Sequence, residues 1–311
     1  MKIRPIIIVA GEPKSIFFEI FIKCLKSQKF RSPLILISSI KILKNQMIKL
    51  GFKRKIKKLN FKELKKEKLN NEFINIIDVS YENDTDYINN CFKMAFKILR
   101  SNLTNKFING PIDKSTFLKK KYLGITEFIS QNFNRNKTAM LIYNKDLSVC
   151  PITTHLPIKL VTQKINQKII REKIILINNF YKNIIKKKPK IAVLGLNPHC
   201  ESIYKFNEDL NIIKPAINNL KKQKYNVSGP FPADTFFLSQ NRKKYNVVLG
   251  MYHDQVLTPL KTIFEYNAFN ITMGLPFIRV SPDHGPNEEM LGKNKSNPES
   301  LIQAINFLDK N

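Results

Sequence analysis

Residues 190–201 read K-I-A-V-L-G-L-N-P-H-C-E, an apolar run that ends in a compact polar motif. The run at 190–196 has the length and composition of a buried strand, so the motif follows where that strand ends. The segments 245–251 and 277–281 repeat the arrangement, because Y-H-D-Q follows the first and P-D-H-G follows the second. Ligands of open α/β sheets bind beyond the carboxyl ends of the strands. The pattern therefore predicts an α/β fold whose chemistry lies at the strand ends.

Strands and helices alternate along the rest of the chain as well, which favours a largely parallel sheet. Further strands are expected at 5–10, 33–39 and 74–79, and helices at 16–25, near 84–99 and over about 158–187. The extended runs 138–143 and 147–153 are separated only by N-K-D and are typical of a hairpin. The mostly parallel sheet should therefore carry an antiparallel element.

Length and composition limit the class of protein. A chain of 311 residues with 43% hydrophobic content favours about two domains. We expect a first α/β domain at 1–124 plus 281–311 and a second, holding most of the motifs, at 125–280. No apolar run approaches the roughly 18 residues that a membrane span needs. The four cysteines show no C-x-x-C spacing, so neither a zinc ribbon nor a disulfide framework is indicated, and a cytoplasmic location is expected.

The formal net charge of +29 raises the question of nucleic-acid binding. The lysines are spread over runs such as 53–58, 62–68 and 186–190, which resemble solvated helix faces and accompany an excess of Ile, Asn and Phe. No spaced stacking aromatics, zinc finger or recognition-helix motif accompanies the charge. We therefore expect no specific nucleic-acid partner and only weak, nonspecific binding to polyanions.

The chain has four histidines, and each lies within a polar motif: His155 in T-T-H-L-P, His199 in G-L-N-P-H-C, His253 in Y-H-D-Q and His284 in S-P-D-H-G. Imidazole is the commonest metal ligand and titrates near neutral pH, so these segments are candidates for one metal ion or one proton-transfer centre. For any single histidine, a hydrogen-bonded loop position is the alternative.

Lys261, Asn270 and Arg279 lie close to the histidine motifs in the sequence. A lysine, an asparagine and an arginine near metal-binding histidines suit an anionic substrate that carries phosphate or carboxylate. The alternative is that Lys261 and Arg279 are simply two of 53 basic residues.

Taken together, the motifs resemble those of the 4-hydroxythreonine-4-phosphate dehydrogenase family. The matching motifs are G-E-P at 11–13, N-G-P-I-D-K at 109–114, T-E-F at 126–128, T-T-H-L-P-I-K at 153–159, G-L-N-P-H-C at 195–200, G-P-F-P-A-D-T at 229–235, Y-H-D-Q at 252–255, N-I-T-M-G-L-P-F-I-R at 270–279 and D-H-G at 283–285. The resemblance therefore spans nearly the whole chain.

The resemblance implies a two-domain, three-layer α/β/α subunit like those of isocitrate and isopropylmalate dehydrogenases, with the active site in the interdomain cleft. It also implies a homodimer that binds NAD or NADP without a G-x-G-x-x-G motif. One divalent metal ion (Zn, Mg, Mn or Co) is held in the family by three histidines drawn from both subunits. The positions that match family site residues are His155, His199 and His253 for the metal, Thr126, Lys261, Asn270 and Arg279 for the substrate, Lys261 and Asp234 for catalysis, and the segment Asp283, His284 and Gly285 on the cofactor side.

The implied reaction is oxidation of 4-(phosphooxy)-L-threonine to 2-amino-3-oxo-4-(phosphooxy)butanoate, which decarboxylates to 3-amino-2-oxopropyl phosphate in pyridoxine 5'-phosphate biosynthesis. The chain departs from the family pattern in three places. Ile125 replaces a histidine, S-I-F-F-E at 15–19 replaces G-x-G-P-E, and P-N-E-E-M at 286–290 replaces small and apolar residues. Two alternatives therefore stay open: a dehydrogenase of another phosphorylated hydroxy acid, such as erythronate or threonate phosphate, and a catalytically decayed homologue with a binding or structural role.

Overall fold

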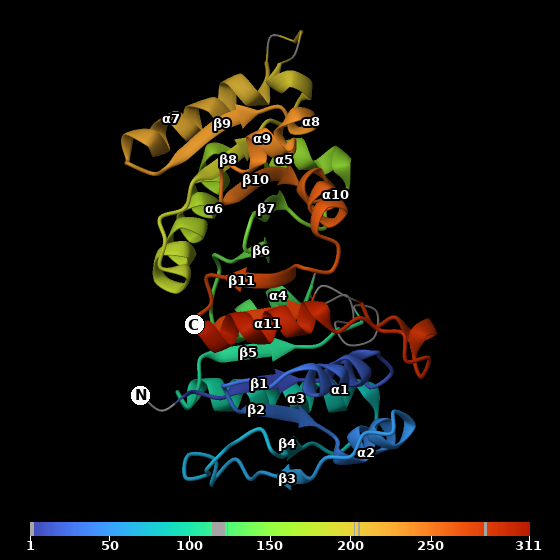
Figure 1. The fold of residues 1–311 in the computed structure, drawn as a ribbon. Helices are drawn as coiled ribbons and strands as arrows, with labels where there is room; N and C mark the ends of the chain where they lie inside the picture. Colours follow the sequence, from blue (N-terminus) through green and yellow to red (C-terminus); the bar gives the residue numbers. More distant parts are fainter. Residues whose placement is uncertain (1–2, 114–121, 123, 202, 205, 283–284) are drawn as a thin grey trace. The chain divides into compact units, whose positions relative to one another are not determined.

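The computed structural model describes residues 3–113, 122, 124–201, 203–204, 206–282 and 285–311 (Figure 1). The chain folds into two compact units: unit 1 comprises Met1–Asn134 and Leu275–Asn311, and unit 2 comprises Arg135–Gly274. Each unit has its own strands and its own helices.

Unit 1 contains parallel strands in the order β3-β4-β2-β1-β5-β12. They are β1 (Ile6–Val9), β2 (Leu34–Ser38), β3 (Ile56–Lys58), β4 (Ile74–Asp78), β5 (Lys106–Asn109) and β12 (Ile278–Pro282). The central strands are continuous runs of buried Ile, Val and Leu rather than alternating patterns, as expected for a sheet covered on both faces.

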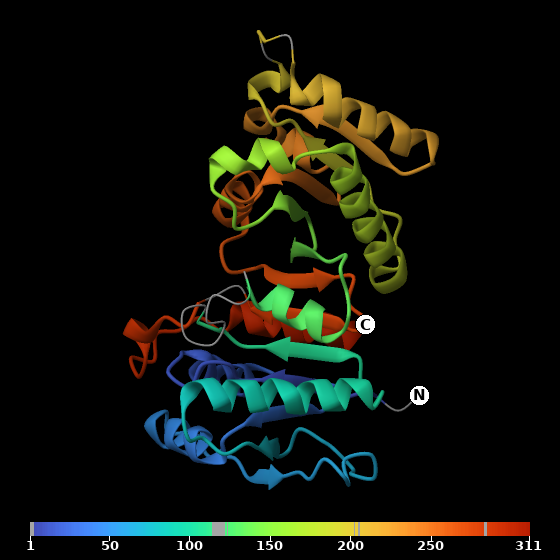
Figure 2. The same cartoon turned by 180° about the vertical axis from the view of Figure 1, so that it is seen from behind.

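Helices cover both faces of this sheet, as Figures 1 and 2 show from opposite sides. The helices α1 (Phe17–Ser27), α2 (Ile40–Lys49) and α11 (Glu299–Lys310) lie on one face, and α3 (Asp84–Arg100) and α4 (Ile125–Asn132) on the other. The expected helix near residue 84 begins where the Asn83 side chain accepts a hydrogen bond from Asp86 N at 2.9 Å.

Helix α4 belongs to unit 1 because its apolar side packs on α3. The Phe128 ring lies 5.5 Å from that of Phe92 and 5.8 Å from that of Phe96, centroid to centroid. The unit therefore extends to residue 134, beyond the expected domain limit near residue 124. Residues 275–280 also fall in unit 1, since Phe277 contacts Phe107 and Phe133.

Unit 2 contains mixed strands in the order β11-β6-β7-β10-β8-β9. They are β6 (Ala139–Tyr143), β7 (Ser148–Thr153), β8 (Ile191–Leu194), β9 (Val227–Phe231), β10 (Val247–Tyr252) and β11 (Phe269–Met273). The expected hairpin is β6–β7, and β11 also pairs antiparallel with β6, whereas β7, β10, β8 and β9 are parallel. The predicted α/β fold, mostly parallel with an antiparallel element and helices on both faces, is confirmed.

The helices of unit 2 are α5 (Val161–Lys164), α6 (Gln167–Phe180), α7 (Lys214–Lys222), α8 (Ala233–Phe236), α9 (Ser239–Arg242) and α10 (His253–Phe264). Short 3-10 and π turns occur at η1 (Ile158–Leu160), η2 (Tyr181–Ile185), η3 (Pro198–Cys200), η4 (Asp209–Ile213) and, in unit 1, η5 (Glu288–Met290). The helix expected over 158–187 is interrupted before α6, because Asn166 is extended and its side chain caps α6 by accepting from Ile169 N at 2.9 Å.

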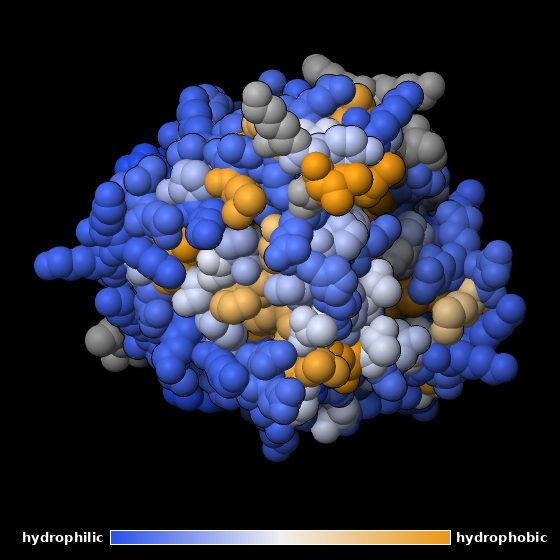
Figure 3. Space-filling model, turned by 90° about the horizontal axis from the view of Figure 1, so that it is seen from above, coloured by the Kyte–Doolittle hydropathy of each residue, from blue (hydrophilic) through white to orange (hydrophobic). Residues whose placement is uncertain are grey.

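Hydrophilic side chains dominate the face of the molecule drawn in Figure 3, where apolar ones form small separate patches. Within the described part of the chain, no helix has the length and apolarity needed to cross a membrane.

Candidate functional site

Three neighbouring strands of unit 2 end at the histidine motifs. His155 lies two residues beyond β7, His253 begins α10 directly after β10, and His199 lies in η3 after β8. The strand order β7-β10-β8 is parallel, so the three carboxyl ends lie along one edge of the sheet. The rings of His155 and His253 lie 6.2 Å apart between centroids, with 36° between their planes. The structure therefore pairs two of the three predicted metal ligands.

The surroundings of His253 suit a metal ligand. Its Nδ1 is 2.6 Å from Asp254 Oδ1, and its side chain keeps 34% of its surface exposed. Metal-binding histidines commonly donate one ring N–H to a carboxylate and coordinate with the other nitrogen. With Nδ1 in contact with Asp254, Nε2 is the candidate ligand nitrogen of His253.

His199 occupies a different environment. Its backbone is left-handed (φ 56°), and its side chain is exposed beside a cavity of about 510 Å³. The cavity is lined by His199, Cys200, Glu201, Asn207, Leu210, Lys214, Gly229 and Pro230. Within the described residues, no three His, Cys, Asp or Glu side chains are gathered closely enough to hold a metal ion. The described residues of one chain therefore do not bring His155, His199 and His253 together as one group.

A buried carboxylate that the sequence motifs do not reveal shapes the His199 turn. Asp209 is fully buried, and it accepts hydrogen bonds from Leu196 N at 2.7 Å, Asn197 N at 3.0 Å and Asn197 Nδ2 at 2.9 Å. Gly195 leaves room for it, because a Cβ there would lie 2.6 Å from Asp209 Oδ1. Asp209 lies outside every motif that matches the family, so only its place in the fold reveals this role.

A second group of predicted site residues lies in unit 1. Arg279, on β12, is fully buried and donates from Nε to Asn109 Oδ1 at 2.7 Å and from Nη1 to Thr126 Oγ1 at 3.4 Å. Burial lowers the pKa of Arg279 to about 10, although the nearby Glu127 carboxylate opposes the shift. The guanidinium remains a cation at neutral pH. Asn109 begins the motif N-G-P-I-D-K, and the structure identifies it as the partner of Arg279.

The other predicted site residues are dispersed. Lys261 is half-buried in α10 of unit 2, and Asp234 is exposed in α8. Asn270, on β11, has a buried Oδ1 without a hydrogen-bond partner among the described residues. Gly285 is exposed, whereas Asp283 and His284 lie outside the described residues. The structure thus brings together the pair His155 and His253 and the pair Thr126 and Arg279.

Two of the departures from the family pattern serve the core of unit 1. Ile125 packs against the apolar cluster under α3 and α4. Phe17 and Phe18 are completely buried, and Gly110 makes room for the first, because a Cβ on Gly110 would lie 2.8 Å from Phe17 Cδ2. The bulky side chains therefore have a packing role in this chain.

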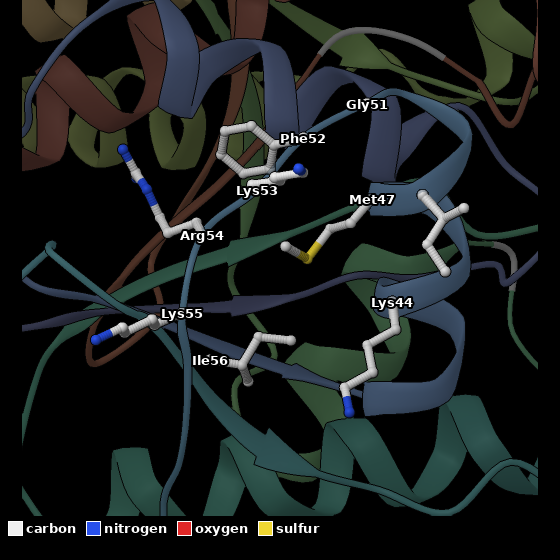
Figure 4. Close-up of a pocket in the computed structure, with 9 residues that line it drawn as sticks. Lys44, Met47, Gly51, Phe52, Lys53, Arg54, Lys55 and Ile56 are labelled. Carbon is white, nitrogen blue, oxygen red and sulfur yellow. The ribbon is translucent and has the colours of Figure 1, made fainter.

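A larger cavity, of about 910 Å³, lies in unit 1 between the end of α2 and the start of β3 (Figure 4). It is lined by Lys44, Met47, Ile48, Gly51, Phe52, Lys53, Arg54, Lys55 and Ile56. It contains none of the predicted site residues and no acid or base suited to proton transfer at neutral pH. We therefore place the candidate site at the histidine strand ends and not here.

Comparison with known proteins agrees with these motifs. A family model described as "Pyridoxal phosphate biosynthetic protein PdxA" matches residues 29–308. A 4-hydroxythreonine-4-phosphate dehydrogenase of Sulfurihydrogenibium sp. (strain YO3AOP1) is 35% identical over 318 residues, covering 96% of this chain and 95% of the relative. A D-threonate 4-phosphate dehydrogenase of Pectobacterium atrosepticum is 32% identical over 218 residues, covering 69% of this chain and 67% of the relative.

The fold is similar to a solved structure as well. The crystal structure of a 4-hydroxythreonine-4-phosphate dehydrogenase from Klebsiella pneumoniae superposes with a TM-score of 0.85 at 27% identity, covering 99% of this chain and 97% of that one.

Proposed function

Because the chain belongs to the PdxA family of pyridoxal phosphate biosynthetic proteins, and thus to a family of dehydrogenases that act on a CH–OH group, we propose that it oxidises 4-(phosphooxy)-L-threonine with NAD or NADP. The observation that carries the proposal is the pair His155 and His253 at adjacent strand ends, with Asp254 orienting the second ring. The product, 2-amino-3-oxo-4-(phosphooxy)butanoate, loses carbon dioxide to give 3-amino-2-oxopropyl phosphate. This reaction belongs to pyridoxine 5'-phosphate biosynthesis.

The proposed roles are carried over from the family positions that these residues match. A bound nicotinamide cofactor would supply the hydride acceptor, and Asp234 is our candidate for the base that takes the hydroxyl proton. Lys261 is a cation on the helix that begins at His253, and it offsets the negative charge that develops on the substrate oxygen. Arg279 and Thr126 bind an anionic group of the substrate. Asn270 is a proposed substrate contact through its side-chain amide, and the segment 283–285, which matches the family's cofactor-side motif, is our candidate for the cofactor side.

The residues present fit a divalent ion only in part. His155 and His253 would hold it from one chain, and the ion would supply Lewis acidity toward the substrate hydroxyl. Because the chain gathers no third ligand among its described residues, we propose that His199 of the partner subunit completes the set in a homodimer. A three-histidine site with open positions accepts Zn, Mg, Mn or Co.

An exposed apolar stretch next to His199 supports the homodimer. Ile203 is 97% exposed, Tyr204 76% and Phe206 60%, in the turn that follows the histidine. Exposed apolar side chains that cluster in this way are typical of protein interfaces.

A second candidate function is oxidation of a different phosphorylated hydroxy acid, such as threonate or erythronate phosphate. The D-threonate 4-phosphate dehydrogenase relative and the apolar packing of Ile125, where the family has a substrate-contacting histidine, favour it. A third possibility, a decayed homologue, is disfavoured because all three ligand histidines and the carboxylate at His253 are retained.

One assay separates these functions. The purified protein is incubated with NAD or NADP and each phosphorylated hydroxy acid, with and without added Co²⁺, Mg²⁺ or Zn²⁺. Formation of NADH or NADPH is followed by near-ultraviolet absorbance. We expect metal-dependent turnover with 4-(phosphooxy)-L-threonine. Preferential turnover of threonate or erythronate phosphate establishes the second candidate, and no turnover with any substrate by a folded, metal-loaded dimer supports the third.

A further inference from the structure

We propose that Gln255 is a positioning residue. It holds the His253 turn, at the start of α10, in a fixed position relative to the His199 turn, residues 195–200. This inference rests on the proposed function, since it concerns how the turns that carry the proposed metal ligands are held in position before any ion binds. Gln255 lies in the first turn of α10, two residues after His253.

The Gln255 amide bridges the ends of two neighbouring strands. Its Oε1 accepts a hydrogen bond from Met251 N at 2.7 Å, and its Nε2 donates to Gly195 O at 2.7 Å. Regular pairing of β10 with β8 reaches Leu249 and Val193. Met251 and Gly195 each lie two residues beyond this last pair. The Gln255 amide therefore connects β10 to β8 after their backbone pairing has ended, at the point where each strand leads into its histidine turn.

The backbone on both sides leaves space for this bridge. A Cβ on Gly250 would lie 2.3 Å from Val256 Cγ1 and 3.1 Å from Gln255 Oε1, so the start of α10 can approach β10 only at a glycine. On the β8 side, the Gly195 carbonyl accepts from Gln255, and Asp209 binds the amides of the next two residues. The backbone that leads from Gly195 to His199 is therefore held by hydrogen bonds at consecutive peptide groups.

The third histidine turn joins the same network. Thr153, buried at the end of β7, donates from Oγ1 to Met251 O at 2.9 Å. Met251 is thus bound through its N–H to Gln255 and through its C=O to Thr153. A continuous series of hydrogen bonds leads from the His155 turn through Met251 and Gln255 to the His199 turn, and all of it lies in unit 2.

The bridge requires a side chain that both donates and accepts. Met has a similar length but makes neither hydrogen bond, whereas Glu keeps an acceptor for Met251 N and turns a carboxylate oxygen toward the Gly195 carbonyl. Gln255→Met therefore removes both hydrogen bonds, whereas Gln255→Glu removes only the one to the Gly195 carbonyl. Gln223→Met, at an exposed glutamine of the same unit, is the matched control.

The test measures Co²⁺ affinity and amide exchange on the full-length protein. We expect Gln255→Met to weaken Co²⁺ binding about 10- to 100-fold, as removal of groups that orient metal ligands commonly does. Gln255→Glu should show a smaller loss with an altered visible Co²⁺ spectrum, and Gln223→Met should match the parent protein. In metal-free protein, hydrogen exchange in the peptide that covers 195–200 should accelerate in both Gln255 variants.

Two failures are distinguishable. If the parent protein binds no Co²⁺, the metal part of the proposed function is wrong, while amide exchange at 195–200 still decides the positioning role. If both Gln255 variants are folded by near-ultraviolet circular dichroism and match the parent protein in Co²⁺ affinity and in exchange, the positioning role is wrong. Should Gln255→Met fail to fold, the Gln255→Glu variant decides the outcome by the same two measurements.

Discussion

The histidines of the candidate site have different chemical neighbours. His253 has a carboxylate on Nδ1, and His155 lies beside it, whereas His199 is exposed in a strained left-handed turn. A left-handed backbone is uncommon for a residue other than glycine and clusters at functional sites. The left-handed backbone of the turn thus supports a functional role for His199 independently of its sequence motif.

Replacing any of the three proposed ligand histidines should remove the proposed metal ion. We expect His155→Ala, His199→Ala and His253→Ala each to lower the bound divalent ion, measured by atomic emission on dialysed protein, to a small fraction of the parent value and to abolish turnover. His284→Ala is the control for metal content only, because the fourth histidine is not a proposed metal ligand. Full metal content in His199→Ala would remove that residue from the ligand set.

Arg279 combines a proposed substrate role with a structural one. Its side chain is completely buried, and Asn109 and Thr126 accept its hydrogen bonds. Arg279→Ala leaves these acceptors without their donor in a dry environment, so the free energy of unfolding should fall by about 2–4 kcal/mol. Urea unfolding measures it, with Arg171→Ala, at an exposed position, as the control. A loss below about 0.5 kcal/mol contradicts the structural role. In folded protein, an increased KM reports on substrate binding.

At the scale of elements, a buried carboxylate fastens helix α1 to the segment before α11. Glu19 accepts hydrogen bonds from Ser296 N at 2.8 Å and Lys23 Nζ at 2.9 Å, and also from Ser296 Oγ. Lys23 in turn donates to Ser296 O at 2.8 Å. Burial alone would raise the pKa of Glu19, but the hydrogen bonds from Ser296 and Lys23 outweigh it, and the pKa is lowered below its ordinary value of 4.5.

This shift gives unfolding a defined pH dependence. Because the folded pKa is depressed, the stabilisation from Glu19 is fully present above pH 4.5 and is lost as the pH falls through the folded value. Glu19→Gln should therefore reduce the free energy of unfolding at pH 7 by about 1–3 kcal/mol, and the difference from the parent protein should shrink below about pH 4. Urea titrations at both pH values test it, with exposed Glu82→Gln as the control. An equal difference at both pH values is incompatible with the ionised clamp.

At the scale of the whole molecule, the proposed homodimer makes the metal site a property of two chains. His155→Ala and His199→Ala chains should each be inactive alone. Suppose that His155 and His253 of a site come from one chain and His199 from the partner subunit. In a mixed dimer, the His199→Ala chain then supplies His155 and His253 to one site, and the His155→Ala chain supplies the His199 of that site. This site is complete, whereas the other site lacks two histidines. Mixing under mild denaturation and refolding should restore metal binding and turnover.

The alternative arrangement makes the opposite prediction. If all three histidines of one chain formed one site, neither site of the mixed dimer would be complete and mixing would restore nothing. A mixture of His155→Ala and His253→Ala chains is the matched control. In the proposed arrangement each site takes both His155 and His253 from one chain, so each site of this mixed dimer lacks one histidine and the mixture stays inactive. Light scattering establishes that the species are dimers.

The sequence by itself determined the alternation of strands and helices, the β6–β7 hairpin and the placement of histidine motifs at strand ends. These features follow from local signals: β-branched apolar runs favour strands, helical spacing of apolar residues favours helices, and a short polar break favours a hairpin. The sequence also carried the family resemblance, because the motifs are contiguous.

Only the tertiary structure decided which residues meet. Arg279 and Asn109 are 170 positions apart, and Gln255 and Gly195 are 60 apart. Their contacts depend on which strands become neighbours in a sheet, and local periodicity carries no information about that choice. The same holds for α4, whose aromatic residues belong to unit 1 because they fit against α3, and for Asp209, whose burial beneath the His199 turn no motif announces. Propensity acts between neighbours in sequence, whereas burial and hydrogen-bond pairing are settled only when distant segments pack together.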